Sequence, residues 1–307
     1  MVDVVGVGLN ATDTLLFLPR FPSSGSKVEV RSLQVLPGGQ VATAMIALQR
    51  WGLRTRYVGK LGDDSAAKIH HEEFTQSNVE TQTTTVPGCP SAQSFIIIDP
   101  AGERTVLWQR EERLELKADE LDRDWIVNAR ALLVDGRDTA AATKAAEWAH
   151  AAKIPVIADL DELYPNLEPL LANVDYLIVS RDFPAKLTGI AELRDSLPEI
   201  KRRFGSLLTA ATLGTDGVLA WDGTEFCYSA AFLVSTVDTT GAGDIFHAAF
   251  IYGLLQNWPL QRILDFACAA AALNCTATGA RGGIESIQKV ENLMSGGERY
   301  SASYALP

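Results

Sequence analysis

The sequence predicts a three-layer α/β protein, built on a doubly wound and mostly parallel β-sheet, with a small β-sheet lid. Apolar segments typical of short buried strands occur at residues 131–134, 156–158, 176–179 and 207–213, with helical patterns such as 139–152 and 192–204 between them. Strands and helices that alternate in this way form a parallel sheet covered by helices on both faces. Two longer helical patterns follow, at residues 242–256 and 259–277.

The first half of the chain is rich in strand signals, which predict the lid. These signals lie at residues 2–8, 12–18, 27–36, 94–98 and 105–108. The last two flank the turn residues Asp99-Pro100-Ala101-Gly102 in a hairpin pattern. We expect one domain over residues 1–307, with the lid strands inserted in it near 12–36 and 91–110.

The composition is that of a globular protein that binds neither nucleic acid nor membrane. Of 307 residues, 47% are hydrophobic and 21% are charged, and the formal net charge is -11. An acidic surface repels a phosphate backbone or an anionic membrane, so any phosphate ligand must be captured locally. The four cysteines are scattered, which predicts neither a disulfide framework nor a zinc site. The chain opens without a basic leader, and we expect a cytoplasmic protein.

The most specific motif is V-D-T-T-G-A-G-D at residues 237–244, which joins a strand-like stretch to a long helical pattern. Small residues let main-chain N–H groups approach a ligand, and the N-terminus of a helix attracts anions. The amides of Ala242 and Gly243 are therefore predicted to hold a phosphoryl group, and Asp244 to accept the proton of a hydroxyl. The plain alternative is a glycine-rich turn in which Asp238 and Asp244 only favour a helix start.

This motif resembles the C-terminal signature D-T-x-G-A-G-D of the ribokinase-like (pfkB) carbohydrate kinase family, and the resemblance extends over nearly the whole chain. It implies an ATP-dependent kinase that uses Mg²⁺, with Asp244 as catalytic base and an anion hole of Gly241, Ala242 and Gly243. The early Asp13 and the segment P-G-G-Q-V-A-T at residues 37–43 match the family's sugar-binding positions. The residues implied in that segment are Gly38, Gly39, Gln40 and Thr43. Taken alone, the two glycines indicate only a turn before a helix.

Other matches point to the nucleotide. The turn T-L-G-T-D-G at residues 212–217 is similar to the family turn that lies along ATP, which implies Thr212, Gly214 and Gly217. The loop at 277–283 resembles the one that borders adenine and implies Gly279, with Asn274 just before it. Asp238 is a candidate ligand of a monovalent cation such as K⁺, although a plain helix C-cap at Gly279 explains this loop equally well.

Departures from the family pattern concern the sugar and the metal. Thr43 stands where many of these kinases have Asn, and S-R-D-F at residues 180–183 replaces N-x-x-E, so the Mg²⁺ ligands stay unidentified. The segments V-S-R-D at 179–182 and D-G-R at 135–137 resemble V-S-K-D and E-G-R of ketohexokinases. They favour a ketose such as fructose, and they place Ser180 and Arg137 at ATP. Gly25 argues against this subgroup, because ketohexokinases present an acidic residue near there.

We therefore expect a kinase that phosphorylates a hydroxyl of a small sugar. Arg110 and Arg137 lie where they could reach an anionic substrate. Because an exposed sheet needs a partner and the family often pairs lids, a homodimer through the lid is expected. The alternatives are a nucleoside kinase of the same fold and a non-catalytic regulator that binds sugar or nucleotide. The segment Gly6-x-Gly8 leads into a strand-like stretch, which disfavours a dinucleotide site, and no Walker-type phosphate loop occurs.

Overall fold

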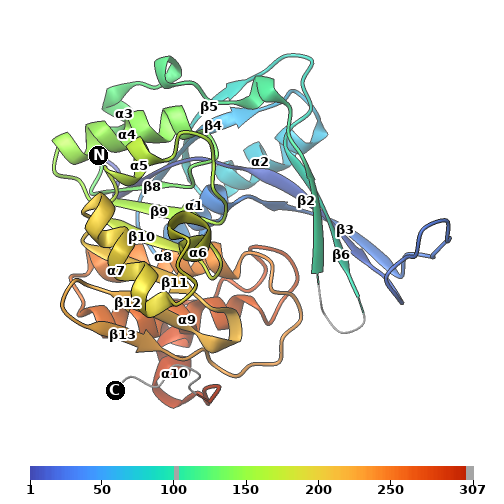
Figure 1. The fold of residues 1–307 in the computed structure, drawn as a ribbon. Helices are drawn as coiled ribbons and strands as arrows, with labels where there is room; N and C mark the ends of the chain where they lie inside the picture. Colours follow the sequence, from blue (N-terminus) through green and yellow to red (C-terminus); the bar gives the residue numbers. More distant parts are fainter. Residues whose placement is uncertain (100–103, 302–307) are drawn as a thin grey trace.

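A sheet of nine strands forms the centre of the computed structural model, which describes residues 1–99 and 104–301 (Figure 1). The strand order is β13-β12-β11-β10-β9-β8-β1-β4-β5, and all neighbours are parallel except β11–β12 and β12–β13. In chain order these strands are β1 Val4–Val7, β4 Thr55–Leu61, β5 Glu80–Thr85, β8 Ala131–Val134, β9 Val156–Leu160, β10 Tyr176–Ser180, β11 Leu208–Thr212, β12 Val218–Trp221 and β13 Phe226–Ser229.

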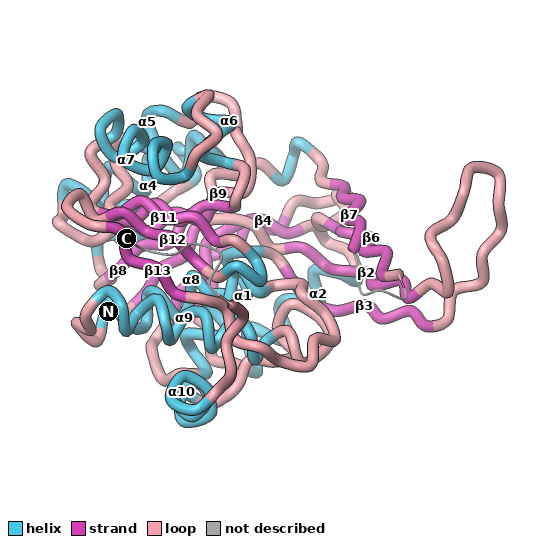
Figure 2. The backbone as a smooth tube through the Cα atoms, turned by 60° about the horizontal axis from the view of Figure 1, so that its bottom comes forward, coloured by secondary structure: helices cyan, strands magenta, loops and turns pink. Residues whose placement is uncertain are grey.

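Helices cover both faces of this sheet and enclose two hydrophobic cores (Figure 2). Because successive side chains of a strand point to opposite faces, Leu133 of β8 packs into one core and Leu132 into the other. The first core contains residues of α1 Gln40–Arg50, α2 Ser65–Gln76, α8 Ala242–Leu255, α9 Leu260–Asn274 and α10 Ile287–Gly296. The second contains residues of α3 Arg123–Val127, α4 Thr139–Ala151, α5 Glu168–Leu171, α6 Phe183–Thr188 and α7 Leu193–Phe204.

A separate sheet of four strands projects from one side of the molecule (Figures 1 and 2). Its order is β3-β2-β6-β7, with β2 parallel to β6 and the two outer pairs antiparallel. The strands are β2 Ala11–Phe17, β3 Ser32–Gly38, β6 Gln93–Ile98 and β7 Arg104–Gln109. The three-layer α/β architecture and the small second sheet, both predicted from the sequence, are confirmed.

The boundaries differ from the expected ones in the small sheet. The alternation at residues 27–36 predicts a strand there, but β3 begins only at Ser32 and runs on to Gly38. Its end is set by pairing with β2, where Gly38 lies opposite Ala11. The predicted turn at 100–102 lies outside the described residues. No helix in the described part of the chain has the length and apolar character to cross a membrane.

Candidate active site

Two adjoining cavities lie at the carboxyl ends of the parallel strands, where ligands bind in open α/β sheets. The first, of about 660 Å³, lies beneath the small sheet, and we call it the lid cavity. The second, of about 570 Å³, lies against the start of α8, and we call it the helix cavity. Asp244 lines both, as do Gln40, Arg104 and Asp161. Asp244 is therefore placed to act between two ligands.

The glycine-rich segment before α8 owes its shape to local sterics. Gly241 is the N-cap residue and has φ 76, a left-handed conformation that favours glycine. A Cβ atom there would lie 2.4 Å from the carbonyl oxygen of Ala280. At Gly243, by contrast, a Cβ atom would meet no heavy atom within 4 Å. The first turn thus packs tightly at Gly241 and is open to the helix cavity at Gly243.

The amides of this first turn form an anion-binding surface. The first N–H groups of an α-helix have no partner inside the helix, which leaves those of Gly243 and Asp244 available to a ligand. The amide of Ala242 differs, because it donates to the carbonyl oxygen of Thr239 at 3.3 Å. The helix dipole adds partial positive charge at the same end. The turn can therefore stabilise a phosphoryl group in the helix cavity.

The pKa of Asp244 is raised to about 8. Although its surface opens to both cavities, the surrounding protein desolvates the carboxyl, and the nearby Asp159 raises the pKa further. His247 and Arg104 act in the opposite direction. A carboxylate with a pKa near neutral accepts a proton more readily than an ordinary one does. Its electrostatic environment thus suits a general base.

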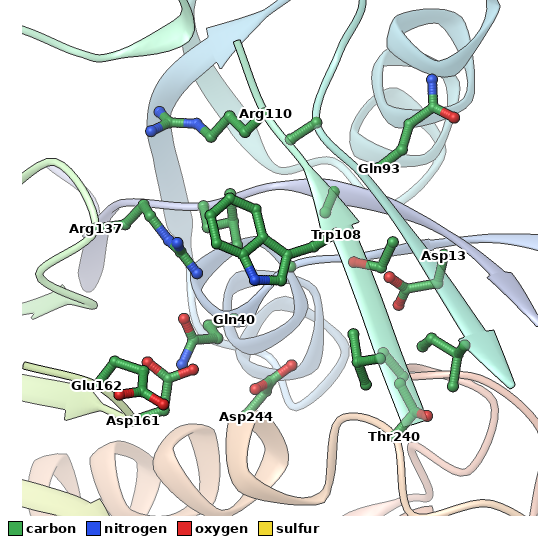
Figure 3. Close-up of a pocket in the computed structure, with 18 of the residues that line it drawn as sticks. Asp13, Gln40, Gln93, Trp108, Arg110, Arg137, Asp161, Glu162, Thr240 and Asp244 are labelled. Carbon is green, nitrogen blue, oxygen red and sulfur yellow. The ribbon is translucent and has the colours of Figure 1, made fainter. Parts of the chain in front are cut away.

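Asp13 faces the lid cavity from β2 (Figure 3). Burial raises its pKa to about 6, while a hydrogen bond with Ser94 and the charge of Arg281 lower it. Gly38 makes room for this carboxylate, because a Cβ atom at Gly38 would lie 2.0 Å from Asp13 Oδ2. Within the cavity, Asp13 and Asp244 can therefore accept hydrogen bonds from different hydroxyls of one ligand.

The structure brings most of the predicted residues to the cavities. Those at the lid cavity are Asp13, Gly39, Gln40, Arg110, Arg137 and Asp244. Those at the helix cavity are Ser180, Thr212, Gly214, Gly217, Gly241, Ala242, Gly243 and Asp244. Gln40 Oε1 is buried without a hydrogen-bond partner among the described residues, which leaves it available to a ligand. Arg137, expected at ATP, lies instead at the lid cavity.

Five predicted residues line neither cavity: Gly38, Thr43, Asp238, Asn274 and Gly279. Thr43 is fully buried, and its hydroxyl accepts from Arg281 Nε at 3.1 Å. The Asn274 side chain donates to the carbonyl oxygens of Thr240 and Ala280, both at 3.1 Å. These side chains set the position of the lining loops.

Four residues that line the cavities were not predicted from the sequence, namely Arg104, Trp108, Asp159 and Asp161. Asp159 and Asp161 lie at the carboxyl end of β9, next to the strand expected at 156–158. Because ligands bind at the carboxyl ends of parallel strands, this position could have indicated that both residues line the site. Arg104 and Trp108 lie on β7, whose side chains could be assigned to the cavity only once the orientation of the small sheet was known.

The nine-stranded sheet, the projecting small sheet and the cavities between them define a ribokinase-like α/β protein. The model of the pfkB family carbohydrate kinases matches residues 1–287, so the chain belongs to this family and is a sugar kinase. This confirms the family and the enzyme class expected from the signature motif.

Named relatives and a solved structure align with most of this chain. The ATP-dependent ribose-1-phosphate kinase of Halopiger xanaduensis is 28% identical, over 92% of this chain and 94% of that protein. The 5-dehydro-2-deoxygluconokinase of Geobacillus kaustophilus is 25% identical, over 84% of each chain. The structure of Arabidopsis thaliana ribokinase complexed with ribose and ATP aligns with a TM-score of 0.84, at 24% identity, over 95% of this chain and 98% of that one.

Proposed function

We propose that this sugar kinase transfers the γ-phosphoryl group of ATP to a sugar hydroxyl, with Asp244 as the base that deprotonates the hydroxyl. The observation that carries the proposal is the position of Asp244, in the first turn of α8 and in the lining of both cavities. The sugar would occupy the lid cavity and ATP the helix cavity, so that the hydroxyl and the γ-phosphate meet at the carboxylate.

The amides at the start of α8 would stabilise the charge of the transferring phosphoryl group. Gln40 and Asp13 would orient the sugar, and the turn with Thr212, Gly214 and Gly217 would lie along the nucleotide. Closure of the small sheet over the lid cavity would exclude water. In this proposal residues 1–307 form one kinase domain, and the small sheet is its lid.

Mg²⁺ would enter with the nucleotide and neutralise phosphate charge. The described residues contain no group of three His, Cys, Asp or Glu side chains that could hold a metal ion. This agrees with the usual mode of Mg²⁺ binding, in which most ligands are waters and substrate phosphates. A K⁺ ion would be held through the loops that Asp238 joins, because both oxygens of this carboxylate already accept hydrogen bonds.

The sugar is proposed to be a ketose such as fructose, on the strength of the segments at residues 135–137 and 179–182. The names of two relatives, a 5-dehydro-2-deoxygluconokinase and a ribose-1-phosphate kinase, show that related chains accept other sugars. The test is ATP consumption by the purified enzyme with ketoses, aldoses, keto-deoxy acids and nucleosides. Turnover with a sugar supports the proposal, preference for a nucleoside supports the alternative kinase, and no turnover with any acceptor would favour a non-catalytic regulator.

A homodimer through the lid is proposed from the outer face of the small sheet. Leu33, Val35, Phe95 and Leu107 are exposed there, from three strands of that sheet. Apolar side chains grouped on an open sheet favour a partner of the same kind. Sedimentation of the wild type and of Leu33→Lys would test this, with a dimer expected only for the wild type.

A cytoplasmic location is proposed from the cysteines. All four are free, as in proteins of reducing compartments.

A further inference from the structure

Arg137, in the wall of the lid cavity, has no counter-ion among the residues that the structure describes. Its guanidinium lies 4.7 Å from the ring centre of Trp108 and 5.1 Å from that of Tyr164. Its Nε atom is buried and has no hydrogen-bond partner in the described part of the chain. Within that part, no acidic side chain lies within 4.0 Å of its guanidinium nitrogens. The two rings therefore hold the cation in place and leave its N–H groups unused.

The acidic groups near Arg137 are engaged with other donors. Asp138 forms a bidentate pair with Arg110, at 2.7 and 2.8 Å. Glu162 pairs with Lys186 at 3.1 Å, and Asp161 accepts from the hydroxyl of Tyr164 at 2.7 Å.

Asp135 accepts from two backbone N–H groups, those of Leu9 and of Arg137 itself. Arg110 is engaged by Asp138 and also donates to the carbonyl oxygen of Leu114. Arg104 lines the helix cavity as well as the lid cavity. Arg137 is thus an arginine that lines the lid cavity alone and can still bind an anion.

The position of Arg137 indicates which ligand would carry the anion. Arg137 and Asp13 enter the cavity from opposite sides, with the indole of Trp108 between them and Asp244 below (Figure 3). Arg137 is absent from the lining of the helix cavity, where the nucleotide would bind. A sugar whose hydroxyls contact Asp13 and Asp244 would therefore direct a further substituent toward Arg137.

We propose that the acceptor is not neutral fructose itself but a ketose that carries an oxyanion, a carboxylate or a phosphate, and that Arg137 binds this group. The proposal rests on the assignment of the lid cavity to the sugar. A planar guanidinium can bind either oxyanion through two parallel hydrogen bonds, and aromatic rings that fix its plane reduce the entropy lost on binding. Trp108 and Tyr164 are then positioning residues for Arg137.

The test compares kcat/KM for neutral sugars with kcat/KM for the matching sugar acids and sugar phosphates. The wild type should prefer one anionic series, and which series it prefers identifies the oxyanion. In Arg137→Gln, kcat/KM for the anionic acceptor should fall about 10- to 100-fold, which is the usual effect of removing hydrogen bonds to a charged group. The value of kcat/KM for neutral sugars should change little. Arg137→Lys keeps the charge and should retain an intermediate value. The KM for ATP should stay unchanged in both variants.

Arg262→Gln is the matched control, because Arg262 also stacks on an aromatic ring, that of Trp258 at 4.1 Å, yet lines neither cavity. It should leave the acceptor preference unchanged. Thermal melting of each variant separates loss of binding from loss of fold. A wild type that prefers neutral sugars, an unchanged preference in Arg137→Gln, or a loss confined to the KM for ATP would each overturn the subsite. None of these results would contradict the proposed kinase function, since phosphorylation of any sugar demonstrates that function.

Discussion

The Asp238 carboxylate joins Gly279 to the signature segment. Its Oδ2 accepts from the amide of Gly279 at 2.8 Å, and its Oδ1 accepts from the amide and the hydroxyl of Thr240, at 2.9 and 2.7 Å. All three bonds are buried. One side chain thus couples the turn before α8 to the loop after α9.

Asp238→Ala is expected to lower the free energy of unfolding by about 2–4 kcal/mol, because it removes a buried charged acceptor from several donors. The measurement is urea denaturation. Asp222→Ala is the control, since Asp222 forms the same turn with Thr224 at an exposed site. Equal losses in the two variants would show that the link between the loops adds no stability.

Gly241 and Gly243 should respond differently to substitution. Gly241→Ala forces a side chain into a left-handed backbone and against Ala280, so a loss of about 1–3 kcal/mol in stability is expected. Gly243→Val should fold, because its Cβ position is open, but its side chain would block the anion-binding amides. Loss of one such donor typically lowers kcat about 10²- to 10³-fold. Melting and kinetics on the same preparations test both, and an active Gly243→Val would show this glycine to be structural only.

Asp13→Ala is expected to raise the KM of the sugar more than the KM of ATP, because Asp13 lines the lid cavity and not the helix cavity. A carboxylate that accepts two hydroxyl hydrogen bonds contributes roughly 1.5–3 kcal/mol per bond, which corresponds to a tenfold or larger increase in KM. Steady-state kinetics with each substrate varied in turn measure the two constants. Equal increases for both would place Asp13 outside the sugar site.

Asp244→Asn should stabilise the protein at alkaline pH. The folded-state pKa of Asp244 is about 8, raised by burial and by Asp159, whereas an unfolded Asp has a pKa near 3.8. The folded protein therefore holds this proton more tightly, and the stability that the group contributes is lost as pH rises from about 4 to about 8. The free energy of unfolding of the variant, relative to that of the wild type, should therefore rise by roughly 3–4 kcal/mol between pH 5 and pH 8. A constant difference across this range would mean that Asp244 titrates normally.

The sequence allowed Asp244 and the glycine-rich turn to be placed at the start of a long helix, because a glycine pattern before a helical segment predicts this local geometry. The role of Thr43 could not be derived in this way. It lies on a helix face, and the buried Arg281 that contacts it comes from a loop 238 residues away. Arg137 was expected at ATP from a short local match, but it lies in the wall of the lid cavity beside Trp108 of β7. Such pairings depend on tertiary packing between distant segments.

The most direct test of the proposed mechanism is the turnover of Asp244→Asn, with ATP and the best acceptor from the substrate screen. Loss of the general base should lower kcat by a factor on the order of 10²–10⁴, while ATP affinity stays close to that of the wild type because the side-chain shape is retained. ATP binding to the same preparation, measured by calorimetry, confirms that the site is intact. A folded variant that binds ATP and turns over at nearly the wild-type rate would contradict the assignment of Asp244 as the base.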